Sequence, residues 1–331
     1  QSVNLPTNWL FILLIAFIST SWILVTYIYD PILTQFFLVL GTFALCVWLK
    51  NPTNIWWILF SGASFSISAL IRPTFQILTP LLALIIWFLW RSRKAAIVFL
   101  ISWILLVGSY SLRNYVNHGF FGVSCATGLS LTGRAATFLE KARPLYPTEV
   151  DEFLKIRDIR GNTLGARSIK WLMSNRGMTW PQANNFLVKV CTAAIIRAPM
   201  RYLVEVGKSM ITFHMPGALK GERGMLLPFY FVDALFTGIF LICTMIWISF
   251  HLMRLFTSAI SGTWAIEDSF ILLFFVIYWY CALISCGVDY GRPEHRISVL
   301  YLIPLTSLLI LHRLEFSKSP FFLSLAKRFH K

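Results

Sequence analysis

Charged residues are scarce in this chain: only 13% of its 331 residues are Asp, Glu, Lys or Arg, about half the share found in an ordinary soluble domain. Asp30 is the only charged side chain among the first 49 residues. Hydrophobic residues make up 57% of the chain, more than a soluble core of this size can bury. The composition excludes an ordinary soluble protein and predicts an all-α polytopic membrane protein.

Several motifs are also missing. The chain has no Gly-rich loop of the nucleotide-binding kinds and no internal repeat. No Asn-x-Ser/Thr glycosylation acceptor is present, which favours a bacterial source. The six cysteines include no CxxC pair, which disfavours a metal cluster. Only Cys125 and Cys191 lie outside the apolar stretches, and the sequence leaves open whether they form a disulfide.

Eight apolar stretches approach the length of about 20 residues that a helix needs to cross a bilayer. We predict three parts: residues 1–112 with five transmembrane helices, residues 113–228 as a mainly α extracytoplasmic domain, and residues 229–331 with three transmembrane helices and a basic cytoplasmic tail. The predicted spans are 8–29, 32–49, 55–70, 75–90, 95–110, 229–250, 270–285 and 297–311.

The distribution of basic residues predicts the orientation of these spans. The span ends that include Lys50, Arg91 and Arg254 carry ten Lys and Arg residues, whereas the opposite ends carry three. The positive-inside rule places the first set in the cytoplasm, so Asp30 and residues 113–228 are expected outside it. We therefore predict a bacterial inner-membrane protein in contact with the lipid bilayer. Nucleic acid is not an expected partner there.

The predicted outer domain is basic and helical. Residues 113–228 hold 16 Lys and Arg against 7 Asp and Glu, a net charge of about +9. This charge fits either a specific anion site or simple adhesion to anionic headgroups. Residues 113–133, rich in Gly, Ser, Asn and Thr, predict loop with at most a short strand. The predicted helices are 149–157, 164–175 before Gly177, a third beginning at Thr179-Trp180-Pro181, and 200–213 after Ala198-Pro199, the last two as an antiparallel pair.

Polar side chains gather at the predicted outer ends of the spans. An ionisable group at the membrane edge costs a few kcal/mol unless it is paired or faces water, so each is a candidate functional residue. Simpler alternatives exist, because interfacial arginines often extend to water and Asp before Pro is a good helix start. The candidates are Asp30; Arg72; Arg113, Asn114, Tyr115 and His118; Asp233; and Asp289, Arg292, Glu294, His295 and Arg296.

One carboxylate among several arginines suits a phosphate bound beside a divalent cation. Hard cations take carboxylate oxygens, and guanidinium groups bind phosphate oxygens through two parallel hydrogen bonds. If short outer loops bring these residues into one cavity, the sequence predicts binding of a lipid-linked phosphate.

The order of the motifs resembles that of the GT-C glycosyltransferases that use lipid-linked sugars, in particular the bacterial branch related to protein O-mannosyltransferases and aminoarabinose transferase of lipid A. The similar stretches are "YIYDPILTQFFLVLG", "FSISALIRPTFQILTPLLALIIW", "SLRNYVNHGFFGVS", "AIIRAPMRYL" and "GRPEHRISVLYLIPL".

The resemblance implies transfer of a sugar from a polyprenyl-phosphate carrier to an extracytoplasmic glycan, lipid or protein. The mechanism expected is direct displacement with inversion, supported by a divalent metal, Mg²⁺ or Mn²⁺. The base would be a first-loop acid. Because the chain begins with Gln1 and no basic segment precedes its first apolar stretch, it is expected to be an N-terminally truncated piece that lacks this acid.

The resemblance also implies roles for individual residues. Asp30 is the expected catalytic acid, on the metal side of the site or positioning the substrate. Arg72, Arg113 and Arg296 are expected to hold the carrier phosphate, in that order, with Arg292 beside the last. Asn114, Tyr115 and His118 would contact the sugar or the phosphate edge. The stretch "EHRISVLYLIP" departs from the usual Arg-Tyr-x-x-Pro motif of the family, which weakens the assignment of Arg296 as a ligand of the carrier phosphate.

Two other functions fit the same composition. An O-antigen ligase or polymerase also combines many spans with a basic outer loop, but it would use loop arginines and histidines and need no metal. A transporter or flippase would be no enzyme. Transporters usually show repeated halves and polar groups near the bilayer midplane, whereas the charges of this chain gather at one face.

Overall fold

The computed structural model describes residues 30–160, 164–214 and 266–288, together with the isolated residues 238–239, 241–242, 244–245, 299, 302–303 and 306. All regular secondary structure in this described part is helical, without a strand. The predicted spans 8–29, 229–250 and 297–311 lie outside the described residues, apart from those isolated positions.

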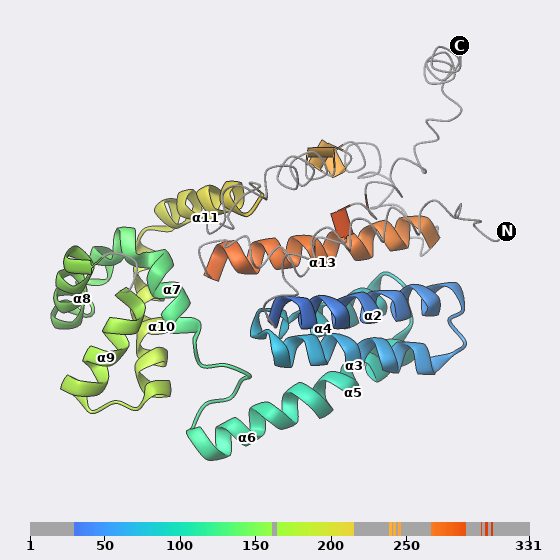
Figure 1. Ribbon diagram of the computed structural model, residues 1–331, viewed down its shortest axis with the longest axis horizontal. Helices are drawn as coiled ribbons and strands as arrows, with labels where there is room; N and C mark the ends of the chain where they lie inside the picture. Colours follow the sequence, from blue (N-terminus) through green and yellow to red (C-terminus); the bar gives the residue numbers. More distant parts are fainter. Residues whose placement is uncertain are drawn as a thin grey trace, which may run out of the picture.

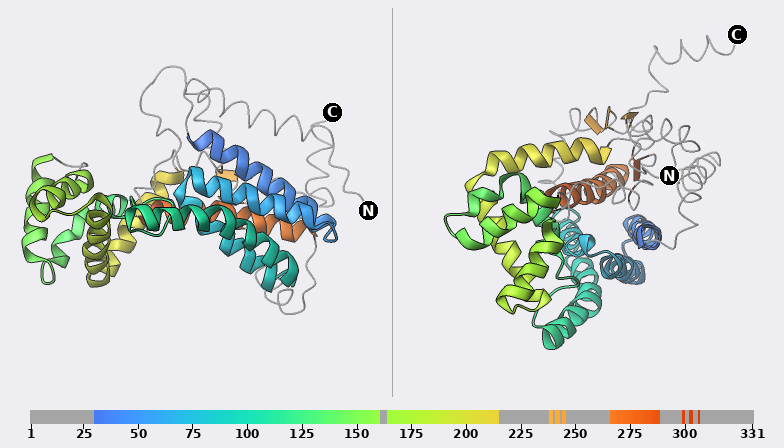
Figure 2. Two further views of the ribbon diagram at one scale, coloured as in Figure 1. Left: turned by 90° about the horizontal axis from the view of Figure 1, so that it is seen from below. Right: turned by 60° about the vertical axis from the view of Figure 1, so that its left-hand side comes forward.

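Five apolar helices lie side by side and form what we call the apolar bundle (Figures 1 and 2). Three stretches of the described chain are long and apolar enough to cross a membrane: Ile32–Lys50, Arg93–His118 and Ser269–Val288. Two further apolar helical stretches, Ile55–Ile71 and Pro73–Phe88, are shorter. The helices of the bundle are α2 (Asp30–Lys50), α3 (Ile55–Ile71), α4 (Leu78–Phe88), α5 (Arg93–Trp103) and α13 (Ile266–Val288).

Small residues allow α3 to approach its neighbours closely. A Cβ atom added at Gly62 would lie 2.8 Å from the backbone oxygen of Phe99 in α5, so only glycine fits there. On another side of α3, the hydroxyl of Ser61 donates a hydrogen bond to the carbonyl of Gly41 in α2 at 2.7 Å. Close contact of this kind is the usual basis of helix packing in a bilayer, where the hydrophobic effect between helices is weak.

The turn between α3 and α4 differs from the single helix predicted for residues 75–90. Pro73 forces the preceding residue out of the helical region, and Arg72 is extended, with φ −130° and ψ 102°. A short 3-10 helix, η1 (Pro73–Phe75), follows, and α4 begins only at Leu78. With 11 residues, α4 is roughly 16 Å long, about half the thickness of a bilayer core.

A second group of helices, the polar helical unit, lies beyond one end of the apolar bundle (Figure 1). It has a hydrophobic core of its own, which includes Phe138, Phe153, Leu172 and Leu187, all fully buried. Its helices are α7 (Thr127–Ala135), η3 (Ala136–Ala142), α8 (Pro147–Arg160), α9 (Leu164–Arg176) and α10 (Trp180–Arg197).

The helix boundaries of this unit follow the predicted signals. Gly177 has a φ of 65° and stands just after α9, a backbone conformation that glycine adopts easily. Thr179 and Gln182 form a capping box at the start of α10. Ala198 then interrupts the helix, with φ −139°, before α11 (Pro199–His214) begins.

The prediction of loop with at most a short strand for residues 113–133 is confirmed only at residues 119–126, and the rest of this stretch is helical. The helix of α5 continues through a π-helical turn, η2 (Ile104–Gly108), into α6 (Ser109–His118), and α7 begins at Thr127. Glycine in α7 serves close packing: a Cβ added at Gly128 would lie 2.2 Å from the backbone oxygen of Asn184 in α10. Composition alone cannot separate glycine that frees a loop from glycine that lets two helices touch.

Helix α11 connects the polar helical unit to the apolar bundle. It packs along α13 rather than forming the predicted pair with α10: the hydroxyl of Tyr202 donates to the carbonyl of Gly287 at 3.1 Å, and the rings of Phe213 and Tyr278 lie 6.2 Å apart. The two helices are therefore antiparallel. The start of α11 lies beside the last turn of α13.

Candidate functional site

An ion pair links the start of α2 to the end of α3. The Nε atom of Arg72 lies 3.2 Å from the Oδ2 atom of Asp30. The side chain of Arg72 is 10% exposed and that of Asp30 is 47% exposed. The structure thus brings together two residues that are 42 positions apart in the sequence, at the end of α2 opposite Lys50.

Burial makes this arginine unusual. Among the charged side chains whose exposure the structure describes, only Arg72 and Arg134 are buried. A buried guanidinium loses its hydration, so its attraction for an anion is stronger than at a water-exposed position. Because the carboxylate of Asp30 is half exposed, the anionic side of the pair opens to the surroundings while the cationic side is held inside.

Hydrogen bonds from two other helices fix the turn that carries Arg72. The hydroxyl of Tyr280, on α13, donates to the carbonyl of Thr74 at 2.7 Å and accepts the backbone N–H of Ile77 at 3.3 Å. From α5, the indole N–H of Trp103 donates to the carbonyl of Gln76 at 2.8 Å. These bonds satisfy backbone groups that the break between α3 and α4 leaves without a helical partner, as an apolar environment requires.

The residues from "LRNYVNHG" lie on α6, away from this turn. Arg113, Tyr115 and His118 are exposed, and the ring of His118 stacks on Phe120 at 6.4 Å. Because Trp103 contacts the turn and Arg113 follows it by ten residues of helix, Arg113 lies roughly 15 Å further along the axis. No contact of the described residues joins Arg113 to Asp30.

Asn114 is buried and has a structural partner. Its side-chain N–H donates to the carbonyl of Gly122 at 2.7 Å, closing the turn that follows α6. Gly119, with φ 72°, ends the helix between these two residues. The other predicted positions lie outside the described residues, namely Asp233, Asp289, Arg292, Glu294, His295 and Arg296.

Sequence reasoning missed two residues around this site and one buried cation elsewhere. Tyr280 and Trp103 lie in apolar stretches and look like ordinary lipid-facing or core aromatics, but both bond to the turn after Arg72. Arg134, 3% exposed, donates from Nη1 to the carbonyl of Glu205 at 3.1 Å, so it joins α7 to α11. A hydroxyl or indole inside an apolar run is the only signal that was available for the first two.

The described residues do not by themselves fit a divalent metal. They contain no group of three His, Cys, Asp or Glu side chains placed to hold an ion. Asp30, the expected metal ligand, has the guanidinium of Arg72 as its partner. A second positive charge this close to the carboxylate opposes the binding of a dication.

Cys125 and Cys191 are free thiols and are not bonded to each other. Cys191 is buried in the core of the polar helical unit, and burial raises the pKa of its thiol to about 12. Its Sγ atom lies 3.6 Å from the hydroxyl of Thr132. This cysteine is a core residue and stays protonated near neutral pH.

Comparisons of the chain with family models, with curated proteins and with solved structures find no match. Function must therefore be inferred from the residues themselves. Their most specific arrangement is the buried Arg72, its half-exposed partner Asp30 and the turn that Tyr280 and Trp103 hold in place.

Proposed function

We propose that this chain belongs to a membrane glycosyltransferase that moves a sugar from a polyprenyl-phosphate carrier to an extracytoplasmic acceptor, with inversion at the anomeric carbon. The observation that carries this proposal is the ion pair between Asp30 and the buried Arg72 at one end of the apolar bundle. The resemblance of the sequence motifs to GT-C glycosyltransferases gives it a reaction class. The proposed setting is a bacterial inner membrane crossed about eight times.

The arrangement of charge in the bundle supports an outward-facing site. Lys50 ends α2, and its Nζ atom lies 6.0 Å above the ring of Phe270 near the start of α13. Asp30 and Arg72 lie at the opposite end of α2 and α3. With Lys50 in the cytoplasm, as the positive-inside rule requires, the ion pair faces outward. The polar helical unit is then the proposed extracytoplasmic domain.

Arg72 is the proposed ligand of the carrier phosphate. A guanidinium group can donate two hydrogen bonds to a phosphate, and a site of low dielectric constant strengthens them. Asp30 would hold the guanidinium in place before the lipid arrives, because an isolated buried charge costs several kcal/mol. The fixed turn from Thr74 to Ile77 would keep this donor from moving away as charge develops.

In the proposed reaction, an acceptor hydroxyl attacks the anomeric carbon. The bond between that carbon and the phosphate oxygen breaks, and its electron pair stays on the phosphate. The hydroxyl proton passes to a carboxylate base that lies outside the described residues. Arg72 would stabilise the additional negative charge on the departing phosphate, which is commonly the largest single contribution to such catalysis.

The exposed residues of α6 have a secondary role in this proposal. Arg113, Tyr115 and His118 are open to solvent and can contact a sugar or the acceptor, but only if the lipid-linked substrate extends beyond the turn at Arg72. Asn114 is not assigned a substrate contact, because its side chain is engaged with Gly122. Metal dependence stays a prediction, tested by chelation and by readdition of Mg²⁺ or Mn²⁺.

The direct test is lipid binding by the full-length protein. Detergent-purified protein is titrated with polyprenyl phosphate and, separately, with the matching polyprenol, and bound lipid is counted by native mass spectrometry. We expect wild type to prefer the phosphate form and Arg72→Ala to lose this preference. Lys50→Gln, which removes a cation from the opposite end of the same bundle, should bind as wild type does.

Turnover provides the second measurement. Membranes are supplied with a panel of polyprenyl-phosphate-linked hexoses and pentoses, and release of the carrier phosphate is followed. Loss of a single charge-stabilising donor commonly lowers rates by about 100- to 1,000-fold, and we expect a decrease of this size for Arg72→Ala. Equal binding of both lipids by wild type, or unchanged turnover in Arg72→Ala, would disprove the proposed role.

A further inference from the structure

A shallow hollow of about 360 Å³ lies on the polar helical unit, remote in sequence from Asp30 and Arg72. One side is the turn between η3 and α8, where Leu145 lies. The other is a face of α10 that includes Lys189, Thr192, Ile196 and Arg197. The ring of Tyr146 packs edge-on against Phe186 of α10 at 5.4 Å, which holds the turn in place. The hollow is therefore a preformed feature of the fold.

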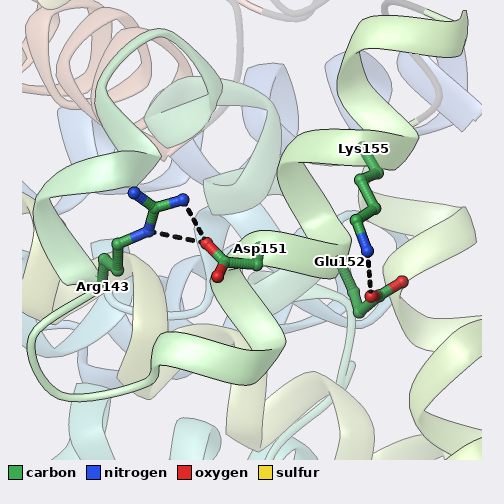
Figure 3. Close-up of polar contacts among 4 residues, drawn as sticks. All are labelled: Arg143, Asp151, Glu152 and Lys155. Atoms are coloured by element: carbon green, nitrogen blue, oxygen red, sulfur yellow. Dashed lines mark hydrogen bonds and ion pairs between the residues drawn. The ribbon is translucent and has the colours of Figure 1, made fainter.

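Two cations at this hollow have no carboxylate partner among the described residues. Lys189 and Arg197 are eight positions apart, roughly 12 Å along one face of α10. In this unit and in α11, the carboxylates whose side chains the structure describes are already paired with other cations, as Figure 3 shows for two of them. The pairs are Arg143–Asp151, Lys155–Glu152, Arg157–Glu140, Arg201–Glu140, Arg176–Glu149 and Lys208–Glu205.

The floor between these cations is apolar. The side chain of Ile196 is 72% exposed and that of Leu145 is 56% exposed. A small inorganic anion gains nothing from such a floor, and a protein partner needs a contact of about 800 Å² on each side. An amphiphile with a phosphate headgroup and a hydrocarbon chain uses both features at once.

The position of the hollow relative to the apolar helices identifies the source of such an amphiphile. The apolar face continues from Ile196 to Met200, which is 71% exposed, at the start of α11. Two residues later, Tyr202 bonds to the carbonyl of Gly287 in the last turn of α13. Ser269–Val288 is one of the stretches long enough to cross a membrane. The hollow thus lies next to the level at which that helix leaves the bilayer.

We infer that this hollow binds the phosphate headgroup of an anionic membrane lipid. Lys189 and Arg197 contact the phosphate, while the lipid chain passes Leu145, Ile196 and Met200 toward the bilayer. The contact fixes the polar helical unit on the membrane surface. This inference is independent of the proposed glycosyltransferase activity, because neither Asp30 nor Arg72 takes part in it.

The test uses the full-length protein in detergent, titrated with short-chain phosphatidylglycerol or with phosphatidylcholine of the same chain length. Native mass spectrometry counts the bound lipid. At roughly a fivefold effect for each cation near an anionic surface, the double variant Lys189→Gln/Arg197→Gln should bind phosphatidylglycerol about 25-fold more weakly. The matched control, Arg167→Gln/Lys170→Gln, removes the same charge from α9 and should bind as wild type does.

Two further arms identify the ligand and guard against misfolding. Arg197→Lys keeps the charge and should keep most of the binding, with an unchanged unfolding temperature. Ile196→Asn should weaken phosphatidylglycerol binding but not the binding of inorganic phosphate. If both double variants lost phosphatidylglycerol binding equally, the lipid would be attracted by the overall charge of the unit rather than by this hollow, and the proposal would be overturned. So would equal affinity for both lipids, or displacement of the lipid by inorganic phosphate at the same concentration.

Discussion

The apolar bundle and the polar helical unit differ in how far the arginines of their ion pairs are exposed. In the bundle, Asp30 and Arg72 form an ion pair in which the arginine side chain is 10% exposed. In the polar helical unit, pairs such as Arg143 with Asp151 lie at the surface, where the arginine side chain is 57% exposed. The two carboxylates are about equally exposed, so water competes for both partners of the second pair but for only the carboxylate of the first. The same residue types therefore carry very different energies in the two regions.

The largest expected effect comes from reversing the bundle pair. In Asp30→Arg/Arg72→Asp, attraction between the two side chains is kept, whereas the cation is moved to a different helix. We expect the swap to recover most of the stability that Arg72→Ala loses, and to leave carrier turnover at least about 100-fold below wild type. Thermal unfolding and release of the carrier phosphate are the two measurements.

The outcome separates a structural pair from a phosphate ligand. A purely structural pair predicts that the swap restores both stability and turnover. If turnover returns to the wild-type rate, the proposed role of Arg72 is wrong even though the bundle is intact. Asp30→Asn adds a second readout: it should weaken turnover less than Arg72→Ala does, because the guanidinium remains in place.

The two regions share a requirement for close helix packing, which glycine substitutions can compare. Gly128→Ala would place a Cβ atom 2.2 Å from a backbone oxygen of α10, and Gly62→Ala would place one 2.8 Å from a backbone oxygen of α5. Overpacking of this kind costs about 1–3 kcal/mol, and we expect the larger value for Gly128. Chemical unfolding monitored by tryptophan fluorescence measures both.

Gly207→Ala is the matched control for these substitutions. It lies in α11, where no described atom apart from the nearby backbone of its own helix lies within 4 Å of the added Cβ, so alanine should be neutral or slightly stabilising. If Gly128→Ala is as stable as this control, then α7 and α10 do not approach as closely as described. Close helix packing at glycine would then be a feature of the apolar bundle but not of the polar helical unit.

Tyr280→Phe tests how the bundle holds the turn after Arg72. The substitution removes one hydroxyl, and with it a hydrogen bond to Thr74 and one from Ile77. Two buried backbone groups left without a partner should cost about 1–3 kcal/mol. Because the turn positions Arg72, turnover should fall about tenfold, mostly in kcat. Tyr110→Phe, at a 39% exposed position on α6, should change neither quantity.

Sequence patterns predicted much of the bundle because apolar runs and helix stops act locally. In the polar helical unit, the end of α9 at Gly177, the start of α10 and the break at Ala198 followed in the same way from glycine, capping residues and proline. The pairing of Asp30 with Arg72 could not be derived from sequence, since it depends on how α2 and α3 pack. At residues 127–133 the composition predicted loop, but these residues form part of α7, where Gly128 allows close contact with α10.

The roles of Tyr280, Trp103 and Arg134 could not be predicted from the sequence either, because they depend on how the helices pack. Each acts through a hydrogen bond to a backbone carbonyl on another helix. A sequence shows which side chains can donate such a bond but not which carbonyl of a distant segment lies opposite. The predicted meeting of Arg113 with Asp30 assumed that outer ends lie at one level, whereas α6 carries Arg113 further along its axis.

The smallest expected effect concerns a surface pair of the polar helical unit. Arg143→Gln removes the partner of Asp151 at a position where both side chains are about half exposed. Exposed pairs contribute up to about 1 kcal/mol, less at high salt, because water and ions screen the attraction. A double-mutant cycle with Asp151→Asn, measured by chemical unfolding at low and at high salt, should give a coupling energy of at most a few tenths of a kcal/mol. A coupling as large as that between Asp30 and Arg72 would remove the contrast between the two regions, and with it the reason for treating the bundle pair as the functional one.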